Sequence, residues 1–209
     1  GRDYGRAHIG QLPPRALLIS TYWDIYSPVM YLRKVDKVRK DLVVIDKELL
    51  RRTWYIKHLK REYPDLMDRI KGIVDNYLAE LVKFEYGRRY DPVTIQKAYI
   101  DLLKGFIEAK MDDGVFLAMP YPDRDLAQAR TEYTRLPFGP DFQVVRDSSS
   151  VPTYDFRRLT IKKPAVLNDE RLTHNAEFLK TMIRYNLRYL QTVNDRETAA
   201  AVEEWLKKF

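Results

Sequence analysis

The chain has 209 residues, with 37 Lys and Arg against 30 Asp and Glu, and a formal net charge of +7. Hydrophobic residues make up 45% and charged residues 32%, a balance that suits one globular domain with its own core. There is no cysteine, which excludes disulfides, Cys-ligated zinc and thiol nucleophiles, and no apolar run approaches the roughly 20 residues that span a bilayer.

The first quarter of the chain predicts a βαβ unit. Residues 1–14 form a lead-in, and the apolar run 16–20 after Pro13-Pro14 predicts a first strand. Ser27-Pro28 predicts a helix start, because Ser can cap free amides and Pro lacks one. Residues 42–45 predict a second strand, and the short crossover between two buried strands implies that they are parallel.

The middle of the chain alternates helical patterns with two further strands. Helices are predicted from Thr53 to about residue 63, over 66–82 with Gly87 as the stop, from Asp91-Pro92 to about residue 107, and over 125–133; strands are predicted at 115–119 and 142–145, the last at the sheet edge. The expected fold class is therefore α/β, with a small, mostly parallel sheet of about four strands flanked by helices.

The C-terminal quarter predicts a helical hairpin. Residues 148–170 contain a serine run, prolines and charges with little periodicity, which is typical of a loop or arm. Residues 171–190 and 195–208 then show helical spacing of apolar positions. We expect an α/β domain over 1–147, a loop or arm over 148–170 and a hairpin over 171–209.

The most specific candidate site lies at the ends of the first two strands. Open α/β sheets bind ligands at the carboxyl ends of their strands, where Asp24 and Asp46 are predicted to lie. They could bind a cation or a sugar hydroxyl, with Tyr22, Trp23 and Arg51 beside them as further ligand-binding candidates. The alternative is structural: Asp24 caps the following helix and Asp46 fixes a turn. We favour the alternative, because no phosphate-binding glycine loop accompanies the two carboxylates.

No catalytic residue, metal site or cofactor site is predicted. His8, His58 and His174 are far apart in sequence and do not show the spacing of metal ligands. Basic clusters are interspersed with acids, which favours a solvated face first, an anionic lipid surface second and nucleic acid last.

Residues 4–55 carry a recognisable pattern: Pro13-Pro14 before an aliphatic strand, Asp24 in the turn, Tyr31-Leu32, Val35, Val38-Arg39, Asp41, the Val43–Asp46 strand, Leu49-Leu50 and Trp54-Tyr55-Ile56. In these features the segment resembles the C-terminal soluble region of a bacterial family of multi-pass membrane proteins, similar to protein O-mannosyltransferases and long filed as a domain of unknown function.

The resemblance implies a parent protein whose membrane helices transfer sugar from a lipid-linked donor. In such enzymes the catalytic acids lie on loops of the membrane part, so no family catalytic residue maps onto this chain. The implied role is that of a non-catalytic, extracytoplasmic (periplasmic) domain of a membrane glycosyltransferase, which supports the membrane part or presents donor or acceptor. Its partners would be that membrane part, an anionic lipid surface or a glycan. A self-contained α/β enzyme, or a sugar- or phosphate-binding domain using Asp24 and Asp46, is the alternative.

Overall fold

The computed structural model describes residues 1–119, 122–147, 154–159, 161 and 170–208 and has an α/β fold. The strands are β1 (Leu17–Ser20), β2 (Val43–Asp46), β3 (Val115–Ala118), β4 (Thr134–Phe138) and β5 (Asp141–Val145). They form one sheet in the order β2-β1-β3-β5-β4, in which β1 pairs in parallel with β2 and β3 while β5 runs antiparallel to β3 and β4.

All four predicted strands are present, and the parallel pairing of the first two is confirmed. The sheet is mixed rather than mostly parallel, because a β4–β5 hairpin extends it. The predicted edge strand at 142–145 is β5, which lies inside the sheet, and the edge is the unpredicted β4. The sequence of β4, TRLPF, has polar residues at its start and a proline near its end, so it gave too weak an apolar signal to predict a strand. Proline in strands is confined to edges and bulges, which fits the edge position of β4.

The helical elements, in chain order, are α1 (Arg2–Ile9), α2 (Trp23–Lys34), the 3₁₀ turn η1 (Leu49–Arg51), α3 (Thr53–Glu62), α4 (Pro64–Arg69), α5 (Lys71–Glu85), α6 (Pro92–Lys110), α7 (Arg124–Ala129), the 3₁₀ turn η2 (Phe156–Arg158), α8 (Glu170–Thr192) and α9 (Arg196–Lys208). The predicted start of α6 is confirmed, since the Asp91 carboxylate accepts hydrogen bonds from the amides of Val93 and Thr94.

Two helix starts differ from prediction. The lead-in contains α1, and Gly5 lets this helix approach α2 closely: a Cβ at Gly5 would lie 2.9 Å from Leu32 Cδ1. Helix α2 begins at Trp23 rather than at Ser27-Pro28, because the Tyr22 carbonyl already accepts the amides of residues 25 and 26. Pro28 therefore lies inside the helix.

The predicted helix over 66–82 is divided into α4 and α5. The break lies at Ile70, whose backbone leaves the helical region (φ −111°, ψ 22°). Its carbonyl then accepts the amides of Ile73 and Val74, as the residue before a new helix does. Gly87, with φ of +65°, ends α5 as predicted.

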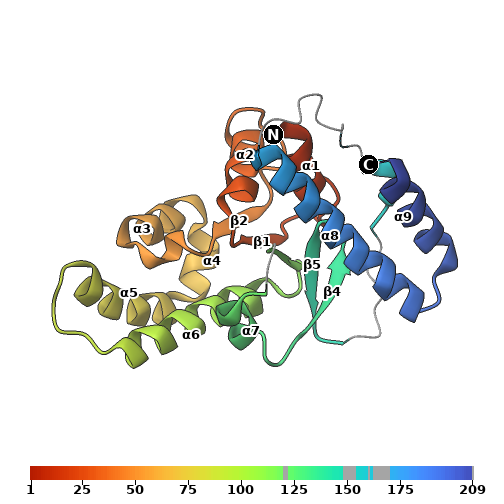
Figure 1. Ribbon diagram of the computed structural model, residues 1–209. Helices are drawn as coiled ribbons and strands as arrows, with labels where there is room; N and C mark the ends of the chain where they lie inside the picture. Colours follow the sequence, from red (N-terminus) through yellow and green to blue (C-terminus); the bar gives the residue numbers. More distant parts are fainter. Residues whose placement is uncertain (120–121, 148–153, 160, 162–169, 209) are drawn as a thin grey trace.

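The helices cover both faces of the sheet. Figure 1 shows α1, α2 and α8 on one side and the α5–α6 pair with α7 on the other. The predicted C-terminal helices are present, and Phe178, Leu179 and Ile183 of α8 belong to the same hydrophobic core as the strands. Most of the expected loop over 148–170 lies outside the described residues; its described part includes η2, with Tyr154 and Phe156 buried.

Within the described ranges, no helix is both long enough and apolar enough to cross a bilayer.

Candidate functional site

Several polar side chains meet at one edge of the sheet. The register aligns Ser20 with both Asp46 and Ala118, so the carboxyl ends of β1, β2 and β3 lie together. Because β5 runs in the opposite direction, with Phe142 opposite Leu117, its first residue, Asp141, lies at the same edge. This is the edge at which the sequence predicts a site.

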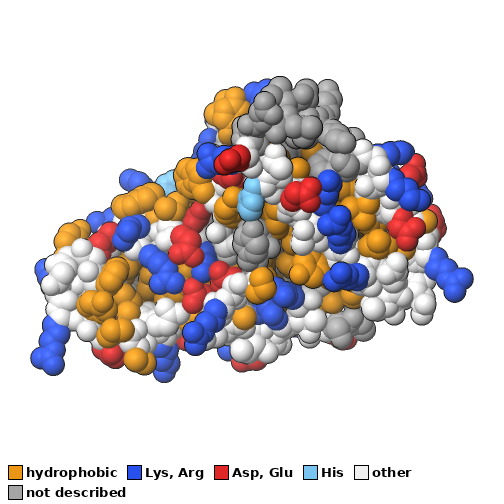
Figure 2. Space-filling view, in the orientation of Figure 1, with side chains coloured by type: hydrophobic (Ala, Val, Ile, Leu, Met, Phe, Trp, Pro, Cys, Tyr) orange, Lys and Arg blue, Asp and Glu red, His pale blue; other side chains and the backbone are white. Residues whose placement is uncertain are grey.

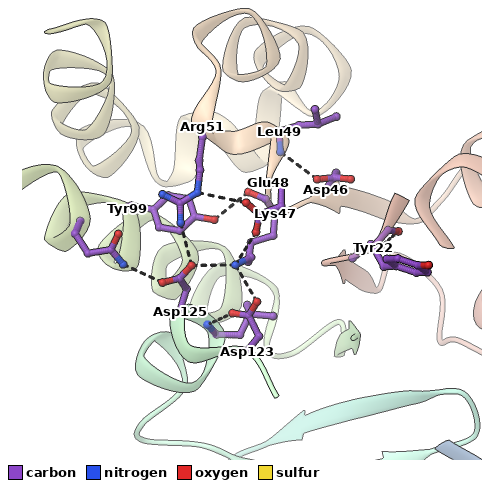
Figure 3. A network of polar contacts seen from close by, with 12 residues as sticks. Tyr22, Asp46, Lys47, Glu48, Leu49, Arg51, Tyr99, Asp123 and Asp125 are labelled. Carbon is purple, nitrogen blue, oxygen red and sulfur yellow. Dashed lines mark hydrogen bonds and ion pairs between the residues drawn. The ribbon is translucent and has the colours of Figure 1, made fainter. Parts of the chain in front are cut away.

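Lys47, the residue after β2, is the centre of a buried charge network (Figure 3). Its side chain is only 4% exposed, and Nζ lies 2.8 Å from Glu48, 2.8 Å from Asp123 and 2.9 Å from Asp125. Burial alone would lower the pKa of the Lys47 ammonium, but the three carboxylates outweigh burial and raise it. The amine is therefore held in its protonated form near neutral pH.

Asp125, near the start of α7, binds three donors. Besides Lys47, its carboxylate accepts Arg51 Nη2 at 3.0 Å and the Gln96 amide at 2.9 Å. Burial raises the pKa of the Asp125 carboxyl, but the three donors lower it by more than burial raises it. The pKa is therefore below its ordinary value. Arg51 also lies over the Tyr99 ring, 4.2 Å from its centroid. The network thereby ties the end of β2 to α6 and α7.

Asp46 points away from Lys47, as successive strand residues do. Its carboxylate accepts the amide of Leu49 at 3.0 Å, and its own amide donates to the Tyr55 hydroxyl at 2.9 Å. Burial raises the pKa of the Asp46 carboxyl, opposed by the hydrogen bonds from the following backbone amides. These contacts are the ones expected if Asp46 fixes the turn after the second strand.

Asp24 is held by α8 instead of capping α2. Its carboxylate lies 2.7 Å from Arg171 Nη2 and accepts Arg171 Nε at 2.9 Å, with Asn175 Nδ2 at 3.5 Å. No side-chain capping bond forms at the start of α2, because the helix begins one residue before Asp24 and the carboxylate turns toward α8. The expected capping role of Asp24 is therefore wrong.

The five predicted ligand residues do not form one cluster. Arg51 belongs to the Lys47 network and Asp46 to the turn before η1, while Asp24 and Trp23 face the space between α1, α2 and α8. Tyr22 packs near His174 of α8, with ring centroids 6.0 Å apart.

A buried histidine adds a pair that sequence reasoning missed. His8 Nδ1 of α1 lies 2.7 Å from Asp141 Oδ1, and the two side chains are 0% and 1% exposed. The Tyr4 ring packs edge-on against His8 at 5.0 Å. Burial raises the pKa of Asp141, opposed by the neighbouring imidazole. The pair links α1 to the β4–β5 hairpin.

A cavity of about 500 Å³ lies elsewhere, at the amino ends of the strands. Among its charged groups, Asp41 pairs with Arg39, and Asp113 pairs with Arg15 and Lys110. Across the described ranges, no group of three or more His, Asp or Glu side chains is arranged to hold a metal ion.

One local feature of the sequence does point to the Lys47 network. The Asp123-x-Asp125 pair follows the third predicted strand, so both carboxylates reach the edge where β2 ends. The partners of Asp24 and Asp141 come from α8 and α1, far away in sequence, and local patterns carry no signal for them.

Comparison of the chain with models of protein families, with curated protein sequences and with solved structures gives no match in any of the three.

Proposed function

We propose that this chain is a non-catalytic extracytoplasmic domain of a membrane glycosyltransferase of the family that residues 4–55 resemble. Its role is to support the membrane-embedded part of the parent protein, its main partner. The net charge of +7 is compatible with a position beside an anionic lipid surface.

The observation that carries the non-catalytic part of this proposal is the mutual neutralisation of charges at the sheet edge. Lys47 keeps its proton, and Asp125 is held ionised by three donors, so neither is poised for proton transfer near neutral pH. Asp46 is 4% exposed and bonded to the turn that follows it. An edge organised in this way stabilises a fold more readily than it performs chemistry.

A self-contained enzyme that uses Asp24 and Asp46 is the alternative proposal. The upward shift of the Asp46 pKa is what favours it, since perturbed carboxyls concentrate at functional sites. Against it, Asp24 pairs with α8 while Asp46 bonds to its own turn, so the two carboxylates are engaged by separate elements.

The test uses the full-length parent. Deleting residues 15–209 should reduce the accumulation of the parent protein, its sugar transfer, or both. Lys47→Met, which breaks the buried network, should reduce accumulation in the same direction, whereas Lys60→Met should not, because Lys60 belongs to an exposed pair with Asp75. Unchanged transfer and unchanged accumulation after the deletion would refute the support role.

The enzyme alternative is tested with the isolated chain. We expect no turnover with a lipid-linked sugar or a nucleotide sugar, since the membrane loops that carry the family's catalytic acids are not among these residues. Turnover that is lost in Asp46→Asn would establish the alternative and overturn the proposal.

A further inference from the structure

Two adjoining cavities lie between α1, α2 and α8. Their volumes are about 420 Å³ and 250 Å³, and together they fall in the range of roughly 300–1,000 Å³ that holds small molecules. Both are lined by Asp24, Pro28, Leu172 and Asn175. This pocket is separate from the Lys47 network, which involves β2, α6 and α7.

Asp24 and Arg171, which both line the pocket, offset each other's charge. Asp24 and Arg171 form a two-bonded ion pair, in which the Asp24 side chain is 10% exposed. Because the two charges offset each other, the pair offers no net attraction to an anionic or a cationic ligand. A neutral ligand is repelled by neither charged group, and its hydroxyl groups can donate to the carboxylate and accept from the guanidinium.

The deeper cavity has polar groups without partners. Tyr4 and Asn175 both line it, and Tyr4 is only 9% exposed. The Tyr4 hydroxyl and Asn175 Oδ1 are buried, and neither finds a hydrogen-bond partner among the residues that the structure describes. Buried polar atoms are almost always bonded, so these two point to a hydrogen-bonding ligand.

The wider cavity has aromatic walls. Trp23 and Tyr31 line it and are 52% and 43% exposed. They lie eight residues apart with Ser27 between them, a spacing that places all three on one face of α2. Tyr31 is fixed by Arg2, which donates to its hydroxyl at 3.0 Å and lies over its ring. Such faces can pack against the C–H groups of a ring-shaped ligand.

We propose that the pocket between α1, α2 and α8 binds a neutral sugar. The ring would lie against Trp23 and Tyr31, and its hydroxyls would reach the Asp24–Arg171 pair, Asn175 and Tyr4. Sugar binding in this pocket would be a role additional to support of the membrane part. Support of the membrane part could hold without sugar binding, and the two have separate tests.

The experiment measures binding of methyl α-D-glucopyranoside, methyl α-D-mannopyranoside and methyl β-D-galactopyranoside to the whole chain. Saturation-transfer NMR at millimolar sugar detects binding, and tryptophan fluorescence reports on the indole. At least one glycoside should bind and change the fluorescence, and a phosphorylated or amino sugar of the same ring should bind less well.

Two variants and one control locate the site. Trp23→Ala should abolish the fluorescence change and weaken binding about tenfold, and Asn175→Ala should weaken binding about two- to tenfold. Trp54→Ala is the matched control: its indole is 54% exposed on α3 and lines neither cavity, so binding should be unchanged. Thermal melts check that each variant is folded, and if Asn175→Ala is not, Trp23→Ala alone decides. Absence of binding for all three glycosides, or binding that survives Trp23→Ala, would overturn the proposal.

Discussion

Replacing Lys47 with Met should destabilise the chain by leaving three carboxylates around an uncharged side chain. Met keeps most of the length of the Lys stem, so the change removes the ammonium with little loss of packing. Removing one partner of a fully buried ion pair costs about 3–5 kcal/mol, because the remaining charge is left without compensation.

The cost should be somewhat lower here. The Asp123 and Asp125 side chains are 16% exposed and Glu48 is 56% exposed, so solvent screens part of the charge. Asp125 also keeps its bonds to Arg51 and Gln96. We therefore expect a loss of about 2–3 kcal/mol in the free energy of unfolding at pH 7.

The loss should depend on pH in a defined direction. The folded pKa of Asp125 lies below its ordinary value, so its stabilising contribution is present above the unfolded pKa of about 4 and is lost as pH falls through the folded value. In Lys47→Met, protonation of the surrounding carboxylates at low pH removes the negative charge that has lost its partner. The difference between wild type and variant should therefore shrink as pH falls below about 4.

The assay is urea unfolding of wild type, Lys47→Met and Lys60→Met across this pH range. The Lys60 control should change stability by at most about 1 kcal/mol, since that ion pair is exposed on both sides. A Lys47→Met protein as stable as wild type at pH 7, or one whose deficit does not change with pH, would refute the account of the network.

Three further predictions concern the other polar contacts at this edge. A double-mutant cycle of Asp24→Ala and Arg171→Ala should give a coupling of about 1 kcal/mol in urea unfolding, with no added stability from calcium, magnesium or manganese; additive effects would contradict the ion pair. Tyr55→Phe should cost about 1–3 kcal/mol, because the buried β2 amide that donates to its hydroxyl loses its partner; a neutral result in thermal melts would argue against that bond. His8→Ala should cost about 3 kcal/mol or more by stranding the buried Asp141 carboxyl, whereas His58→Ala should cost clearly less; equal losses in chemical unfolding would contradict the buried pair.

The parallel half of the fold could be predicted because its signals are local. The four-residue strands β1, β2 and β3 are buried throughout, and all of their residues except Ser20 and Asp46 are apolar. The turn chemistry of Asp91-Pro92 and Gly87 placed helix ends correctly. The β4–β5 hairpin was only half predicted, because proline and charge weaken the pattern of its edge strand. The start of α2 was misplaced because Ser27-Pro28 is a strong local signal, although the helix is set by the end of β1.

The positions of the two candidate carboxylates in the fold could be predicted, but their partners could not. Asp24 and Asp46 do follow the ends of β1 and β2, as the βαβ pattern requires. What each carboxylate does is decided by its partner, and the partner of Asp24 is Arg171, 147 positions away. A single sequence does not show which residues far apart in the chain come into contact, so the same residues were compatible with a cation site, a cap or an ion pair.

The edge also explains why α1 and α8 matter to the fold. Asp24, Asp46 and Asp141 all lie at this edge, and the carboxyl group of each is bound by a different partner. Asp46 uses backbone amides of its own turn, whereas Asp141 needs His8 of α1 and Asp24 needs Arg171 of α8. Displacing either helix would therefore strand a carboxylate as well as expose apolar surface, and the two costs would arise together. Because α1 and α8 also enclose the proposed sugar pocket, the contacts that keep them in place preorganise the Asp24–Arg171 pair for a ligand.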